Sequence, residues 1–422
     1  MTKPLNLKYF IYFIIPLLIW LHFLKDTFTA YYFILFFLVS FSIYFFILEK
    51  RFHEIKFRDV LLWLFFFYVF SLIIIFIFSL INLGRFSIST NELLIAFGRL
   101  LIGPILTFAV FNYFVNRGNI DKIFTALVIL FLLAVLSIII QIIYGHIPFF
   151  GNEFYHTARY GIYGYSSIVG SVVAFGVSFY TPVFYIYLRT YNQYFKHITK
   201  GFIISIIFIG AVLAMSKAGL INIALCLVIM TLFIYKKKNY TIFITIFVST
   251  ILAIYISDTF YTGLIGLYAN TTGHEIVDGT INTTHYHSII DLALERVSLR
   301  FFPDGLLYSN VDYIFGVGVY GGAGALSISG VTTTTHNAYM DIYLMGGIIA
   351  ILSLLSLMTA VQFRLISIFL SSRNEIELIL IFSNFMLFFN MLFFNGALMH
   401  PVIASSFWVS IAYLILLKSR IK

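Results

Sequence analysis

Long apolar runs, separated by short polar segments, dominate the pattern along the chain. Runs of about 20 apolar residues, the length needed to cross the hydrocarbon core of a bilayer, recur along it. Because these runs are continuous and do not alternate with polar residues, helices are favoured over barrel strands. The sequence therefore predicts an all-α polytopic membrane protein in which residues 1–422 form one integral membrane domain. Twelve spans are predicted, with apolar cores near residues 9–24, 28–48, 60–82, 93–115, 122–144, 166–188, 201–215, 218–235, 240–257, 338–360, 376–396 and 401–417.

The composition agrees with a chain whose solvent is lipid. It is 61% hydrophobic, 19% aromatic and only 10% charged, whereas about a quarter of the residues in a soluble domain are charged. The only cysteine, Cys226, cannot form a disulfide within the chain. The first apolar run has no small-x-small cleavage pattern, so we interpret it as an uncleaved helix.

The basic residues predict the orientation. An even number of spans puts both termini on one side, and 19 of the 26 Lys and Arg residues then lie on that side. Cytoplasmic loops collect Lys and Arg, so both termini are predicted to be cytoplasmic. The same rule explains the net charge of +9 better than nucleic-acid binding does.

Two predicted extracytoplasmic loops are longer than a turn, at residues 145–165 and 258–336. The second is the only domain-like polar segment, and we expect it to contain short helices. One is an amphipathic stretch over 287–302, in which Arg296 and Arg300 share a face. Like charges four residues apart repel unless an anion lies between them, and Arg can bind phosphate through two parallel hydrogen bonds. A bound phosphate and a solvated face with acid partners such as Asp304 or Asp312 remain open alternatives.

Four other features carry weaker signals. The glycine-rich run 316–324 lacks the Lys-Ser/Thr of a nucleotide loop, so we expect a flexible hinge over the membrane surface. His274, His285 and His287 have no Cys or carboxylate to complete a ligand set, so no metal site is predicted. Lys25 and Arg85 fall in short loops, where side chains snorkel to the interface. Arg99 lies inside the span 93–115 and is either a site residue or part of a structural pair.

The most informative segment is the junction between the long loop and the span 338–360. His336 and Asn337 precede this span, and a neutral imidazole there can act as a base near pH 7. Asp341, one turn into the span, needs a partner because a carboxylate in a membrane helix is costly. It is a candidate to orient His336 or to hold an incoming hydroxyl. The alternative is that Asn337 merely caps the helix.

Four pieces of sequence carry a family resemblance. They are Arg159-Tyr160-Gly161-Ile162-Tyr163, Met215-Ser216-Lys217-Ala218-Gly219-Leu220, Arg296 followed by Phe315-Gly316-Val317-Gly318, and Thr335-His336-Asn337-Ala338-Tyr339 with Gly346-Gly347-Ile348-Ile349. Together they resemble the O-antigen polymerase and ligase superfamily, the Wzy and WaaL type of bacterial membrane glycosyltransferase. Three features depart from that pattern: Lys217 replaces an Arg, Ala350 stands where the family has Gly, and Tyr339-Met340 shifts the apolar residue that follows His-Asn.

The resemblance implies an enzyme of the bacterial cytoplasmic (inner) membrane with its site on the outer face. Donor and acceptor would be saccharides linked to undecaprenyl diphosphate, and no metal, nucleotide sugar or other cofactor is implied. His336 would be the base, and Arg159, Lys217, Arg296 and Arg300 would hold the diphosphate, with Asn337, Asp341 and Arg99 in support. A direct displacement would invert the anomeric centre. The resemblance also makes a polysaccharide co-polymerase, which regulates chain length, a candidate protein partner.

Three alternatives to a repeat-unit polymerase stay open from the sequence. A ligase of the same superfamily would share the fold and the chemistry and differ in its acceptor. A flippase for lipid-linked saccharide can also have twelve spans, although such carriers usually show internal repeats and polar groups near the midplane. A structural assembly component would leave the outer arginines without an explanation.

Overall fold

The computed structural model describes residues 59–86, 309–319, 337–392 and 404–420, parts of 90–107, a few residues within 124–132, residues 202–206, Leu398 and two short strands. Contacts group the chain into two units, one of residues 1–19, 27–120 and 297–422 and the other of 20–26 and 121–296. The described part is helical apart from one two-stranded hairpin. Two of its helices are long and apolar enough to cross a membrane. The helical prediction is therefore confirmed over this part, while the twelve spans and the placement of the termini stay predictions.

Helix α3, Val60–Ile81, matches the predicted span 60–82. It is 22 residues long and contains no charged side chain, so it measures about 33 Å at 1.5 Å per residue. Asp59 caps its start, since the side chain accepts a hydrogen bond from the Leu61 N–H at 3.0 Å. Asn82 follows its last residue, and the short helix α4, Leu83–Phe86, comes next.

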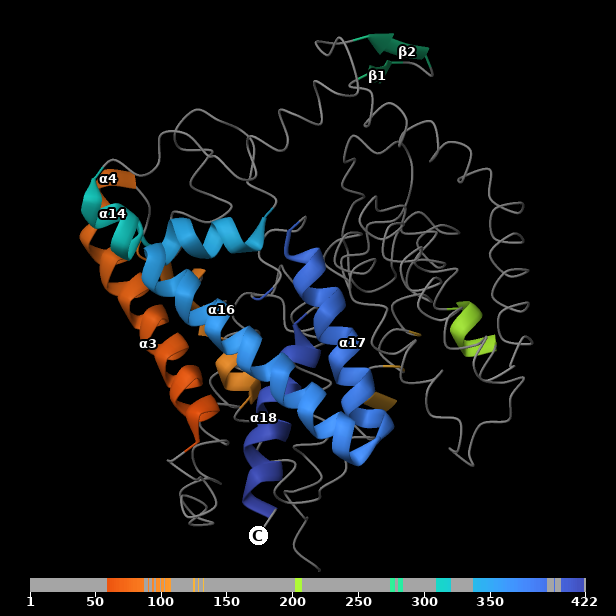
Figure 1. The fold of residues 1–422 in the computed structure, drawn as a ribbon. Helices are drawn as coiled ribbons and strands as arrows, with labels where there is room; N and C mark the ends of the chain where they lie inside the picture. Colours follow the sequence, from red (N-terminus) through yellow and green to blue (C-terminus); the bar gives the residue numbers. More distant parts are fainter. Residues whose placement is uncertain are drawn as a thin grey trace, which may run out of the picture. The chain divides into compact units, whose positions relative to one another are not determined.

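Helix α16, Ala338–Ser372, packs along α3 (Figure 1). Every third or fourth residue of α3 from Leu61 to Ser79 is buried. Small residues make the contact close: Ser353 Oγ donates to Ser71 Oγ at 3.1 Å, and both serines are buried. Small residues and interhelical hydroxyl bonds are the usual means of packing apolar helices closely.

The long helix α16 is broken at Gly347, which has φ 61° and ψ −159°. Only glycine adopts this region readily, because a Cβ would clash with the backbone. The break leaves a first part of nine residues, 338–346, and a second part that is still long enough to span a bilayer by itself. The predicted apolar span 338–360 is therefore confirmed as helical, but the break at Gly347 was not predicted.

The segment beside this break is helix α14, Asn310–Phe315, with the loop that follows it. The N–H of Val317 donates to the Leu344 carbonyl at 3.0 Å, and the N–H of Gly318 donates to the Met345 carbonyl at 2.9 Å. The last carbonyls of a helical segment have no partner within it, so the loop supplies the donors that the break requires. Val317 is fully buried as a result.

The approach of the two backbones is possible because glycines face each other. A Cβ on Gly316 would lie 2.2 Å from the Met345 carbonyl oxygen, and a Cβ on Gly347 would lie 2.2 Å from the Ile314 carbonyl. We call residues 316–318 together with 344–347 the glycine crossing. The expected flexible hinge at 316–324 is thus wrong for residues 316–318, which are packed and hydrogen-bonded. Residues 316–318 of the predicted polar loop 258–336 are therefore buried against α16.

Helices α17, Glu375–Asn390, and α18, Ser405–Arg420, complete the described helices and pack against each other. They correspond to the predicted spans 376–396 and 401–417, although α17 ends earlier than expected. Asn384 Nδ2 donates to Ser410 Oγ at 2.9 Å in the middle of this pair. Near its other end the Tyr413 hydroxyl donates to the buried carboxylate of Glu377.

The hairpin lies in the predicted loop 258–336 and was not predicted. Strands β1, His274–Val277, and β2, Thr280–Thr283, are antiparallel, with His274 opposite Thr283. Asp278 and Gly279 separate them, and Asp-Gly is the dipeptide that a tight two-residue turn prefers. The short helix α14, in contrast, agrees with the expectation of short helices in this loop.

One ion pair ties the start of α3 to the second part of α16. Both guanidinium nitrogens of Arg364 donate to the Asp59 carboxylate, one of them to Oδ2 at 2.9 Å. The Asp59 side chain is 3% exposed and that of Arg364 is 27% exposed. The Asp59 carboxylate therefore caps α3 and pairs with Arg364 at the same time.

We expect Gly347→Ala to lower the free energy of unfolding by at least about 3 kcal/mol, because backbone strain of about 1–3 kcal/mol adds to the clash with Ile314. Gly84→Ala is the matched control, since nothing lies within 4 Å of its Cβ position. Thermal unfolding of the purified protein in detergent measures both. Equal midpoints for the two variants would contradict the crossing.

We expect Asp59→Ala to destabilise more than Asp59→Asn. Both lose the charge beside Arg364, but Asn still caps α3, which is worth about 1 kcal/mol. A double-mutant cycle of Asp59→Ala with Arg364→Ala should give a coupling of about 1–3 kcal/mol. Additive effects in unfolding experiments would show that the two side chains do not interact.

Candidate functional site

Two of the predicted site residues, Asn337 and Asp341, are described by the structure. The base His336, the four cations proposed for the diphosphate and the supporting Arg99 lie outside the described residues; the four cations are Arg159, Lys217, Arg296 and Arg300. The structure therefore describes the start of α16, which follows His336 in the sequence, and the elements that hold it. It leaves the convergence of these cations as a prediction.

Asn337 is the N-cap of α16. Its backbone is extended, with φ −139° and ψ 108°, and its side-chain oxygen accepts hydrogen bonds from the N–H groups of Tyr339 at 3.0 Å and Met340 at 3.4 Å. The first N–H groups of a helix have no partner within it, and Asn is among the residues that satisfy them best. The capping interpretation of Asn337 is confirmed. Because the residue is 1% exposed, this side chain has a fixed direction in the core.

Asp341 lies one turn into the same helix and is 2% exposed. Its N–H donates to the Asn337 carbonyl at 3.0 Å, which is the first regular bond of the helix. The N-terminal turn of a helix favours negative charge, because the free N–H dipoles point toward it. A carboxylate is therefore placed where the helix itself helps to stabilise its charge.

The start of α16 is fastened to the end of α17. The Ala338 N–H donates to the Met391 carbonyl at 2.8 Å, and the Tyr339 hydroxyl donates to the Phe388 carbonyl at 2.9 Å. These bonds use a donor that is free at a helix start and acceptors that are free at a helix end. The first part of α16 is thus fixed at one end by α17 and at the other by the glycine crossing.

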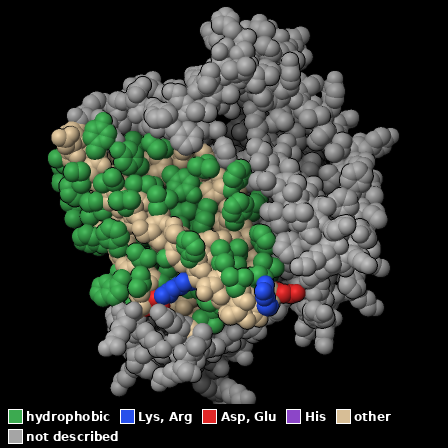
Figure 2. All heavy atoms as spheres, viewed as in Figure 1, with side chains coloured by type: hydrophobic (Ala, Val, Ile, Leu, Met, Phe, Trp, Pro, Cys, Tyr) green, Lys and Arg blue, Asp and Glu red, His purple; other side chains and the backbone are tan. Residues whose placement is uncertain are grey.

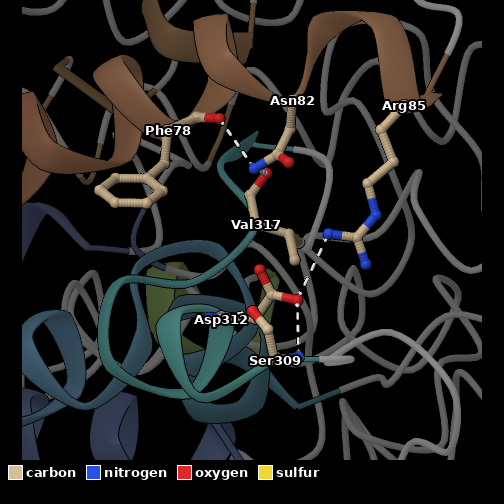
Figure 3. Close-up of polar contacts among 6 residues, drawn as sticks. All are labelled: Phe78, Asn82, Arg85, Ser309, Asp312 and Val317. Carbon is tan, nitrogen blue, oxygen red and sulfur yellow. Dashed lines mark hydrogen bonds and ion pairs between the residues drawn. The ribbon is translucent and has the colours of Figure 1, made fainter.

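Polar contacts hold the α14 segment to the end of α3 (Figure 3). Arg85 Nη1 contacts Asp312 Oδ2 at 3.3 Å, and the same carboxylate oxygen accepts from the Ser309 N–H at 3.2 Å. Ser309 Oγ accepts from the Asp312 N–H at 3.2 Å, which completes a capping box at the start of α14. Asn82 Nδ2 donates to the Val317 carbonyl at 3.4 Å and to the Phe78 carbonyl at 3.0 Å.

These contacts change the interpretation of two charged residues. Arg85, expected to snorkel from a short loop, forms an ion pair instead. Asp312, considered as an acid partner for Arg296 or Arg300, has Arg85 as an ion partner and also caps α14. Both residues therefore attach the α14 segment to α4, the short helix that follows α3.

The described part of the site can hold and orient groups. Within it, no cluster of three His, Cys, Asp or Glu side chains is placed to bind a metal. What it offers is a fixed helix start bearing a buried amide and a buried carboxylate, with His336 directly preceding Asn337 in the chain.

Comparison with known proteins gave no match. Neither the protein-family models, nor the curated proteins, nor the solved structures contain one. The site therefore has to be argued from its own residues.

Sequence reasoning missed the α14 segment as a part of this scaffold. Two signals were available in the sequence. The paired glycines at 316 and 318 and at 346 and 347 permit a backbone crossing, and Val311, Tyr313, Ile314 and Phe315 are apolar residues in a segment taken as a polar loop. Neither signal identifies the segment that the glycines contact, because glycines permit a close backbone approach without specifying which segment approaches.

We expect Asn337→Ala to lower the free energy of unfolding by about 1 kcal/mol, since the first turn of α16 loses its side-chain acceptor. Asn337→Ser is the matched control, because serine caps nearly as well without adding charge beside Asp341. Thermal unfolding in detergent compares the two. A Ser variant as unstable as the Ala variant would indicate that the amide has a role besides capping.

Proposed function

We propose that this chain is a multi-pass glycosyltransferase of the cytoplasmic membrane. It would polymerise repeat units linked to undecaprenyl diphosphate into an O-antigen or capsular polysaccharide on the outer face. Membrane location is supported by two helices long and apolar enough to span a bilayer and by the 61% hydrophobic composition. The chemistry is proposed from the sequence motifs and the scaffold that carries one of them.

One observation supports the proposal best. Two of the four motif pieces, the Gly-x-Gly of residues 316–318 and the Gly-Gly of residues 346–347, contact each other in the glycine crossing. They lie about 30 residues apart in sequence, and this contact brings two of the motif pieces to one place in the fold. The crossing also fixes the nine-residue helical part 338–346, whose N-cap Asn337 is next in the chain to His336.

The reaction follows from the proposed roles. A hydroxyl oxygen of the acceptor sugar attacks the anomeric carbon of the donor while the bond from that carbon to the diphosphate oxygen breaks. His336 takes the hydroxyl proton, and undecaprenyl diphosphate leaves with the bonding electron pair. Preorganised cations stabilise the developing charge without a metal, and attack from the face opposite the leaving group inverts the anomeric centre. The proposed cations are Arg159, Lys217, Arg296 and Arg300, with Asp341, Asn337 and Arg99 in support.

A transporter of lipid-linked saccharide is a second candidate, favoured by one observation. Discontinuous helices are common at the substrate sites of transporters, and α16 is discontinuous at Gly347. Buried polar pairs such as Asn384 with Ser410 also lie inside the described helices. A polymerase remains the first choice, because the break lies beside the motif pieces and gives the helix start next to His336 a fixed position.

The test replaces His336 by Ala and examines the length of the surface polysaccharide. We expect long chains to fall by at least about 100-fold, the usual contribution of a general base, and single repeat units to remain on the acceptor. His274→Ala is the matched control, a histidine of the same predicted loop that carries no motif. Equal amounts of both variants in the membrane exclude a folding defect.

Other outcomes identify the alternatives. Long chains made by the His336→Ala variant at the wild-type level would contradict a catalytic His336. In a deletion strain, lipid-linked polymer without transfer to its acceptor would indicate a ligase. Lipid-linked single units retained on the cytoplasmic face would indicate a transporter.

A further inference from the structure

Helices α3 and α16 leave a broad apolar face uncovered. Trp63 is 60% exposed, Phe70 is 55% exposed and Phe363 is 69% exposed. Figure 2 shows hydrophobic side chains over most of this face, with the charged side chains in view along one edge. Its most exposed members are Val60, Trp63, Phe67, Phe70, Ile73, Ile77, Leu80 and Ile81 of α3 and Ile348, Leu352, Leu355, Phe363 and Leu370 of α16.

Charge is confined to the two ends of this face. Between Asp59 and Arg85, α3 carries no charged residue, and none occurs in α16 between Asp341 and Arg364. The pair Asp59–Arg364 lies at one end and the pair Arg85–Asp312 at the other. The 22 residues of α3 between them span about 33 Å, close to the roughly 30 Å thickness of a bilayer core.

Helix α14 exposes its apolar side chains and buries its acidic one, the reverse of what a helix on a water-facing loop does. Val311, Tyr313 and Ile314 are 51%, 49% and 44% exposed, whereas Asp312 is 6% exposed and turned to Arg85. Apolar groups exposed to water are unfavourable at about 25 cal/mol per Å². The headgroup boundary of a bilayer favours the same arrangement, since apolar side chains and the amphipathic Tyr ring can enter it.

The residue types of this face distinguish lipid from a second protein. Helix interfaces within membranes are enriched in small residues, because these let backbones approach. The buried side of α3 has such residues: Ser71 contacts Ser353 of α16, and Ser79 lies against Gly318. The exposed side of α3 has large aliphatic and aromatic side chains only. This side therefore suits fluid acyl chains better than a packed helix.

We propose that the joint outer face of α3 and α16 lies against the acyl chains of the bilayer, with α14 in the headgroup boundary. The pair Asp59–Arg364 marks one polar boundary and the pair Arg85–Asp312 marks the other. This inference rests on the membrane location in the proposed function and is independent of the glycosyl-transfer chemistry.

The test places one nitroxide label at a time in the protein reconstituted in lipid bilayers. Cys226 is the only cysteine, so Cys226→Ser gives a background for single-cysteine variants. Phe70→Cys and Leu352→Cys sample the middle of the face, and Val60→Cys and Val311→Cys sample its two ends. Collision with oxygen, which concentrates in the bilayer, is compared with collision with a water-soluble nickel chelate. The ratio of oxygen to nickel collision should be severalfold higher for the two middle positions than for the two ends.

Ser71→Cys is the matched control, because it neighbours Phe70 in sequence but is 1% exposed against α16. It should react with the label much more slowly than Phe70→Cys does. A reaction as fast as that of Phe70→Cys would mean that the two faces of α3 are assigned wrongly.

Each remaining outcome overturns the inference in a recognisable way. Strong nickel collision at position 70 would mean that the face meets water. Weak collision with both probes would mean that protein covers it, and dipolar broadening between labels would identify that protein as a second copy. Extraction of the whole chain from membranes by alkaline carbonate would refute the membrane location itself, and with it the proposed function.

Discussion

The glycine crossing is the constraint on which the described structure depends. Two backbone segments hydrogen-bond at 2.9–3.0 Å beside a broken helix, where a Cβ on Gly316 or Gly347 would clash with the opposite backbone. Gly316 and Gly347 provide that space, and each has a positive φ that other residues rarely adopt. The crossing joins the end of a long loop to the middle of a helix sequence. It thereby converts α16 into a short part that carries the candidate site and a long part that packs on α3.

Polar contacts around the crossing follow one rule: each satisfies backbone or charge that an apolar bundle would otherwise leave without a partner. Asn82 and the loop N–H groups donate hydrogen bonds to carbonyls, and Arg85 forms an ion pair with Asp312. Asn337 accepts hydrogen bonds from N–H groups in the first turn of α16. Unpaired polar groups in a medium without water cost several kcal/mol each, so such contacts decide where irregular backbone can occur. The break in α16 is tolerable because the loop completes it. This arrangement also explains why α14 keeps its acid inward and its apolar residues outward.

The candidate site could be predicted from sequence only as a set of residue types. Asn337 before an apolar run predicted its own capping role, because capping depends on the next three residues alone. Asp341 was recognised as buried because it lies inside an apolar helix. The attachment of Ala338 and Tyr339 to the end of α17 was not predicted, since it joins residues about 50 positions apart. The convergence of Arg159, Lys217, Arg296 and Arg300 with His336 is a proposal of the same long-range kind.

Local sequence is enough to place the apolar helices of the described part. The start of α3 at Val60, the start of α16 at Ala338 and the positions of α17 and α18 follow from continuous apolar runs, caps and the hydrogen bonds within each helix. Long-range packing is needed to explain that α16 breaks at Gly347, that residues 316–318 are buried against it and that Arg85 pairs with Asp312. Helices are set by neighbours three or four residues away, whereas a break, a crossing and an ion pair are set by whichever distant segment arrives beside them.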